Sequence, residues 1–302
     1  MSEYRRRTPS PFPDDLRASF ISDALATHDG CPDIPTKIDK PFWKYMVSSD
    51  GMTAYIARHK FRFPMRSWER RERRAVFSFS RFGRTETMLP DGRLVYIGGV
   101  HEVFYDDDYF IYNDVVVVRG HSDGREKAEA KLDARFAKFP EYPRSSVDRM
   151  KSFHIEGFLT HATAVEEAIP DEIDMYGYPT DIFPPTDHHT ATYHKDENSG
   201  KEYIYIIGGS GYKGGPHREA TLTHRLDLQD FSIQRMETTG EKPPPGFKRE
   251  ARKDGDTIVY ATEESDYMLS LTDMGWSKTQ WEYSPGLSSE PGEPCKRQCQ
   301  VI

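Results

Sequence analysis

A recurring unit constrains the fold of this chain more than any other feature. In each copy, a glycine-containing turn is followed by a β-rich run that contains tyrosine, and the copies lie at residues 50–56, 91–99, 199–209 and 254–261. The turn glycines are separated by 41, 108 and 55 residues. Because 108 is about two units of 54, the spacing predicts one degenerate unit within the long interval. A repeat of this length is typical of propeller blades.

Further matching elements flank these turns. Upstream, residues 83–87 and 188–192 are similar, and each is expected to form the strand that enters the turn. Downstream, Leu226-Asp227-Leu228 is followed by Ile233, and Leu269-Ser270-Leu271 is followed by Trp276 at the same distance. The composition, with 13% aromatic residues, 22 Gly and 21 Pro, also favours many short strands separated by turns. A strand, a turn and an outer strand are therefore expected to recur in the same order.

The units resemble kelch-repeat β-propellers. The resemblance rests on two glycine doublets that end apolar strands, Gly98-Gly99 and Gly208-Gly209, on the Leu-Asp-Leu strand, on Trp276, and on the linker at residues 239–244. It implies an all-β, kelch-like β-propeller in which four-stranded sheets stack around an axis because none can bury both faces alone. At 45 to 55 residues per unit, residues 41–290 supply about five or six blades.

The remaining segments set the expected domain organisation. Residues 1–40 are predicted to contain a disordered tail and a short amphipathic helix over 14–29, and the texture changes to strands after Pro41. Residues 121–170 interrupt the propeller with Ala, Glu and Lys at helical density, which predicts an inserted helix. Residues 291–302 are expected to form a flexible tail.

Charge and hydropathy exclude several classes of function. The net charge of -8 argues against generic nucleic-acid binding, which needs a basic surface. No run of 18 apolar residues occurs, and because the N-terminal residues carry charge and Pro where a signal peptide needs an apolar core, we do not expect secretion. Three cysteines, two of them in the last eight residues, do not make a disulfide framework, so we expect a cytoplasmic protein.

Two clusters of imidazoles and carboxylates are the candidates for chemistry. The first cluster follows the first glycine doublet and contains His101, Glu102 and Asp106. The second lies at the start of the unit that contains the second doublet and consists of Asp187, His188 and His189. Loops at these places gather at the openings of a propeller, so the two clusters are expected to converge and to offer ligands for Zn²⁺, Fe²⁺ or Ca²⁺. The alternative is structural: neither cluster has ligand spacing on one element, histidines there often bond to backbone, and Asp-rich loops are often solvated turns.

Recognised cofactor and hydrolase motifs do not occur. The sequence has no phosphate-binding Gly-Lys-Ser/Thr loop, no Gly-x-Ser-x-Gly elbow and no Cys-x-x-Cys pair. We therefore expect no cofactor, and enzymatic activity has little support.

The last residues contain a second motif. Cys299 stands four residues from the end with Val301 and Ile302 after it, which resembles the C-a-a-X prenylation boxes of lipid-anchored small GTPases. Lys296 and Arg297 precede it, and Cys295 is a candidate for palmitoylation as the second signal that one lipid chain needs for stable binding. A frayed tail, or a Cys295–Cys299 pair that binds metal or forms a disulfide, is the alternative.

The sequence favours a protein-interaction scaffold, held through its tail at the cytosolic leaflet of a membrane. This inference is an analogy, because fold alone does not imply function. The alternative function is an enzyme, or a protein that binds a small ligand or metal, with its site at the opening of the propeller.

Overall fold

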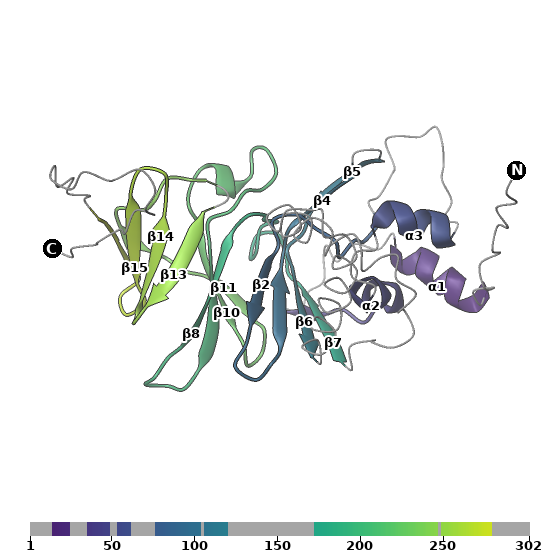
Figure 1. Cartoon of the computed structure of the whole chain (residues 1–302), viewed down its shortest axis with the longest axis horizontal. Helices are drawn as coiled ribbons and strands as arrows, with labels where there is room; N and C mark the ends of the chain where they lie inside the picture. The colour runs from purple at the N-terminus through teal and green to yellow at the C-terminus, as the bar shows by residue number, and fades with distance from the viewer. Residues whose placement is uncertain are drawn as a thin grey trace, which may run out of the picture.

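The computed structural model describes residues 14–24, 35–48, 53–61, 76–103, 106–119, 172–246 and 249–279. Over these residues the chain is mostly antiparallel β-sheet with few helices, as the all-β prediction requires. In Figure 1 three sheets follow one another along the long axis of the molecule, and the helices pack at the end that carries the first sheet. No closed ring is formed by the described residues, so the number of blades stays a prediction.

Each of the three sheets is built on a four-stranded meander. The strands of the first sheet are β2 (Thr85–Met88), β3 (Leu94–Ile97), β6 (Asp114–Arg119) and β7 (Glu172–Gly177), with β1 (Thr36–Lys37) on its outer edge. The second sheet contains β8 (Thr190–Lys195), β9 (Glu202–Ile207), β10 (Thr223–Asp227) and β11 (Ile233–Arg235). The third contains β13 (Glu250–Asp254), β14 (Thr257–Ala261), β15 (Asp266–Ser270) and β16 (Gly275–Lys278). The predicted order of entry strand, turn and outer strand is confirmed in the second sheet, as are the predicted entry strand of the first sheet and the predicted outer strand of the third.

The first strands of the three meanders lie next to one another, β2 beside β8 and β8 beside β13. The chain passes from the second to the third sheet through the predicted linker, whose β12 (Thr239–Gly240) pairs in parallel with β16. A smaller two-stranded sheet, β4 (Val100–Val103) with β5 (Asp106–Ile111), leaves the first sheet between β3 and β6.

Side chains that alternate along the strands create the layers. In β6, Val116 and Val118 face the helices, whereas Val115 and Val117 face the second sheet. The first sheet is therefore covered on both sides, which explains why β6 is a continuous run of valines. A third core between the second and third sheets contains Tyr203, Tyr205 and Ile207 with Ile258, Tyr260, Leu269 and Trp276.

Helices occupy the region directly after Pro41, where strands were predicted. Residues Pro41–Ser48 form α2 and Ala54–Phe61 form α3, so the predicted β-rich run at 53–56 is wrong. Thr53 caps α3, since its hydroxyl accepts the amide N–H of Ile56 at 3.2 Å. Burial of Ala54, Ala57 and Phe61 then follows a helical spacing.

The N-terminal helix is confirmed as α1 (Asp14–Ala24), and Phe20 and Ala24 are buried against α2 and α3. The predicted tail at 1–13, the inserted helix at 121–170 and the C-terminal residues from 280 onward lie outside the described residues. None of the described helices is both long enough and apolar enough to cross a bilayer.

Candidate functional site

The two glycine doublets occupy equivalent places in the first and second sheets. Gly98 and Gly99 have φ of 55° and 96°, and Gly208 and Gly209 have φ of 70° and 96°. Such left-handed values favour glycine. Space gives a second reason, because a Cβ on Gly98 would lie 2.5 Å from the carbonyl oxygen of Thr186, in the segment that precedes β8 of the neighbouring sheet. The doublets thus let adjacent sheets approach closely at this end, which we call the glycine end.

The segments that enter the two sheets are equivalent as well. Thr85 pairs with Ile97 and Thr190 with Ile207, each immediately before a doublet. His188 therefore stands where the first sheet has Gly83, and both residues have positive φ, 50° and 62°. The two turns touch, since the amide N–H of His188 donates to the carbonyl oxygen of Gly83 at 2.7 Å.

Of the two predicted clusters, the structure describes the side chains of His101, Asp187, His188 and His189. His101, buried, lies on β4 directly after the first doublet, and Asp187, His188 and His189 lie in the segment before β8. Glu102 is on β4 and Asp106 begins β5, but their side chains fall outside the described part of the chain.

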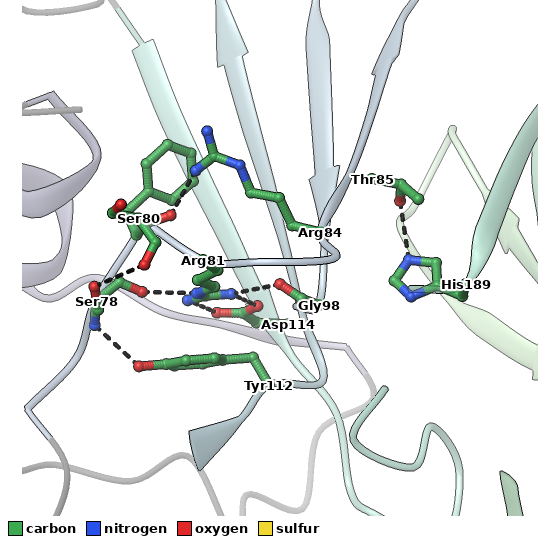
Figure 2. Close-up of polar contacts among 10 residues, drawn as sticks. Ser78, Ser80, Arg81, Arg84, Thr85, Gly98, Tyr112, Asp114 and His189 are labelled. Atoms are coloured by element: carbon green, nitrogen blue, oxygen red, sulfur yellow. Dashed lines mark hydrogen bonds and ion pairs between the residues drawn. The ribbon is translucent and has the colours of Figure 1, made fainter. Parts of the chain in front are cut away.

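His189 connects the first and second sheets. Its Nε2 lies 2.9 Å from the hydroxyl of Thr85 on β2, as Figure 2 shows. Burial, together with the neighbouring His217, His188 and His224, lowers the pKa of His189 to about 3. The ring is therefore neutral at physiological pH, and its hydrogen bond to Thr85 joins two sheets.

A hydroxyl beside an imidazole is also the arrangement of a nucleophile and its base. Two observations oppose that role here. Nδ1 of His189 has no hydrogen-bond partner that would orient the ring, and a base with a pKa of about 3 takes up a proton poorly near neutral pH. The Thr85–His189 pair therefore acts as a structural contact.

The carboxylate of Asp187 is buried, and its Oδ1 lies 3.3 Å from Nδ1 of His188 without hydrogen-bond geometry. Within the described residues, no group of three His, Cys, Asp or Glu side chains is arranged to hold a metal ion. Because the side chains of Glu102 and Asp106 lie outside the described residues, the predicted metal site stays a prediction.

An ion pair that the sequence did not predict lies beside this end. The Arg81 guanidinium donates to both carboxylate oxygens of Asp114, from Nη1 at 2.5 Å and from Nη2 at 2.8 Å. It also donates to the carbonyl oxygens of Ser78 at 2.6 Å and Gly98 at 3.0 Å, and it stacks 3.3 Å from the ring centre of Tyr112 (Figure 2). Both charged side chains are buried. The pair is satisfied internally and fastens the segment before β2 to the first sheet.

The signal for this pair in the sequence is weak. Asp114 is the one charged residue at the start of a run of four valines, which indicates a carboxylate at the mouth of a buried strand. Nothing nearby in the sequence identifies Arg81, 33 residues earlier, as its partner.

A second group missed by the sequence analysis is a set of buried histidines under the second sheet. The rings of His217 and His224 lie 6.4 Å apart, and Phe183 packs edge-on against His224 at 5.3 Å. Burial, with lesser contributions from His217 and Arg235, lowers the pKa of His224 to about 3. His217 lies on a loop and His224 on a strand, so no sequence spacing relates them.

Two exposed aromatic residues lie on the surface of the glycine end. Phe82 is 59% exposed and pairs through its backbone with Val100, the first residue of β4. Val100 pairs with Ile111 of β5, whose amide N–H donates to the Tyr212 hydroxyl at 2.9 Å. Tyr212 is 39% exposed. Phe82 and Tyr212 thus flank the base of the β4–β5 sheet, and we call these two residues the aromatic face.

Comparison with known proteins does not assign this chain to a family. No protein-family model matches the chain, and no curated protein matches it. The lipidation candidates Cys295 and Cys299 lie outside the described residues.

Proposed function

We propose that the chain is a divergent kelch-like β-propeller protein that binds a protein partner through the aromatic face. Support for the propeller comes from three similar meanders with neighbouring first strands, and from glycine doublets in equivalent register. Support for the binding role comes from exposed Phe82 and Tyr212 on either side of the β4–β5 sheet.

Aromatic residues are enriched at protein interfaces because they bury a large area at a small entropic cost. A single exposed apolar side chain needs no such explanation. Met88, which is also 59% exposed, is one at the far end of β2. Phe82 and Tyr212 differ because both lie at the base of the same two-stranded sheet, beside the paired residues Val100 and Ile111.

The polar residues of the same end give less support to an enzyme or a ligand-binding protein. Arg81 and Asp114 satisfy each other, and the Thr85–His189 pair lacks an orienting group. Among the described residues, no set of side chains is assembled in the geometry of a catalytic group. The aromatic face is therefore the observation that carries the proposal.

Site-specific photo-crosslinking tests this function. A photoreactive phenylalanine analogue at position 82 should crosslink to a partner in the native host, whereas the analogue at position 88 should not. With the crosslinked protein purified, Phe82→Ala should weaken binding at least tenfold and Met88→Ala should leave it unchanged. Equal crosslinking at both positions, or equal affinities of both variants, would contradict the proposal.

The tether is the second part of the proposal. If Ile302 is the last residue in the cell, Cys299 is prenylated, residues 300–302 are removed, and Cys295 receives the second lipid. Intact mass of the protein from a eukaryotic host should show this change in wild type and not in Cys299→Ser. An unmodified wild-type mass that retains residues 300–302 would remove the tether without affecting the aromatic face.

A further inference from the structure

Residues 211–221 form the loop between β9 and β10 of the second sheet. Most of its residues are exposed, among them Tyr212, Lys213, Pro216 and Glu219. It carries a short 3-10 helix, Pro216–Arg218, and projects beyond the strands in Figure 1. Loops with this exposure open locally at a small cost in free energy.

His217 is the buried side chain at the centre of this loop. It is 4% exposed, and its ring covers His224, with 6.4 Å between the ring centres. Gly211, at the start of the loop, leaves room for the ring, since a Cβ there would lie 3.3 Å from Cδ2 of His217. A second attachment is a hydrogen bond, which the Tyr212 hydroxyl accepts from the amide N–H of Ile111. Closure of the loop therefore requires burial of the His217 imidazole, together with Thr221 at the end of the loop.

The groups around this imidazole make it sensitive to protonation. Neither ring nitrogen has hydrogen-bond geometry to a partner, although the carbonyls of Pro184 and Gly208 lie close enough to favour the charged ring. Burial outweighs these carbonyls and the nearby Asp187 and lowers the pKa of His217, and Arg235 contributes in the same direction.

The other titratable groups near the ring are two further buried histidines. His189 and His224 both respond to the charge of His217, and their own pKa values are about 3. His188 also acts on His189, and the Arg81–Asp114 pair lies beside Gly98, whose carbonyl oxygen accepts a hydrogen bond from Arg81. A proton on His217 would thus enter a dry cluster in which two neighbouring imidazoles cannot easily share the charge.

We propose that residues 211–221 form an acid-released lid, in which a proton on His217 expels the ring from its site and uncovers His224. The open loop places His217 in water, where it holds the proton at its ordinary affinity. Because Tyr212 is on the same loop, release also displaces half of the aromatic face. The lid itself does not depend on the proposed binding function.

Hydrogen exchange at pH 7.5 and pH 5.0, corrected for the intrinsic rate of exchange, tests this proposal. An unfolded-type pKa of 6.5 allows the lid-opening equilibrium to rise by up to about 30-fold at pH 5.0. Wild-type residues 211–221 should show an increase within that limit, and His217→Phe, whose aromatic ring does not titrate, should show none. The β8–β9 turn at residues 196–201, at the other end of the same sheet, is the internal control for global unfolding and should change less than the loop.

Three results would overturn the lid: no increase in wild type, the same increase in His217→Phe, or an increase in residues 211–221 no larger than the increase at residues 196–201, which indicates global unfolding alone. Should His217→Phe fail to fold, the ring resonances of wild-type His217 can be titrated by NMR. If the ring resonances of His217 and the amide resonances of the loop shift over the same pH range, the lid is supported. If the ring of His217 titrates near pH 6.5 while the loop amides do not shift, the lid is refuted.

Discussion

Loss of the Asp114 carboxylate should be among the most destabilising polar substitutions in the described part of the chain. Asp114→Asn preserves the shape of the side chain but removes the charge that faces the buried Arg81 guanidinium. Two hydrogen bonds to charged groups are weakened, each worth about 1.5–3 kcal/mol, and breaking one partner of a buried pair typically costs about 3–5 kcal/mol. We expect a loss of about 3 kcal/mol for Asn and about 5 kcal/mol for Ala.

Urea denaturation followed by circular dichroism measures this loss. With a slope of about 3 kcal/mol per molar urea, the midpoint of Asp114→Asn should fall by about 1 M. The matched control is Asp39→Asn, which removes a carboxylate from the exposed ion pair with Lys44 and should cost below about 1 kcal/mol.

Removal of both charges tests whether the loss of stability comes from an uncompensated buried charge or from the altered shape of the side chain. In Arg81→Met with Asp114→Leu no uncompensated charge remains, so the double variant should recover part of the stability that Asp114→Leu alone loses. The reasoning would be refuted if Asp114→Asn shifted the midpoint no more than Asp39→Asn does, because the pair would then be neither dry nor important to the first sheet.

Two further predictions concern buried residues at the contacts between sheets. Gly208→Ala should cost about 2–3 kcal/mol more than Gly200→Ala, since both glycines have φ of 70° but only at Gly208 would a Cβ collide with the Tyr260 hydroxyl. Tyr260→Phe should narrow this difference, and equal losses at both glycines in thermal unfolding would show that space does not matter. Acid should weaken the fold: burial lowers the pKa values of His189 and His224 from 6.5 to about 3, so the unfolded chain binds more protons below pH 6.5. Stability is then complete above pH 6.5 and is lost toward pH 3, by about 2 kcal/mol per histidine at pH 5, and urea midpoints that do not change between pH 8 and pH 5 would contradict this.

Local sequence features predicted the strands because their causes are local. The glycine doublets after β3 and β9 are needed where the backbone takes positive φ, and this requirement is visible in the sequence. The same holds for the similarity between residues 83–87 and 188–192, which the pairing register confirms as equivalent.

The helices at 41–61 were missed because short windows conceal their period. Tyr55 and Ile56 after a glycine turn look like a strand, whereas the cap by Thr53 and the packing of Ala57 and Phe61 on α1 and α2 make the segment helical. Here tertiary packing outweighed local propensity.

By itself, the sequence determined that this chain makes short strands joined by glycine turns, in units that repeat. Only the tertiary structure decided that Arg81 meets Asp114, that His189 reaches Thr85 across 104 residues, and that His217 covers His224. The physical reason is the range of the interactions. A turn depends on the backbone of its own residues, whereas a buried charge or imidazole depends on which distant groups replace water around it, and no spacing along the chain specifies those groups.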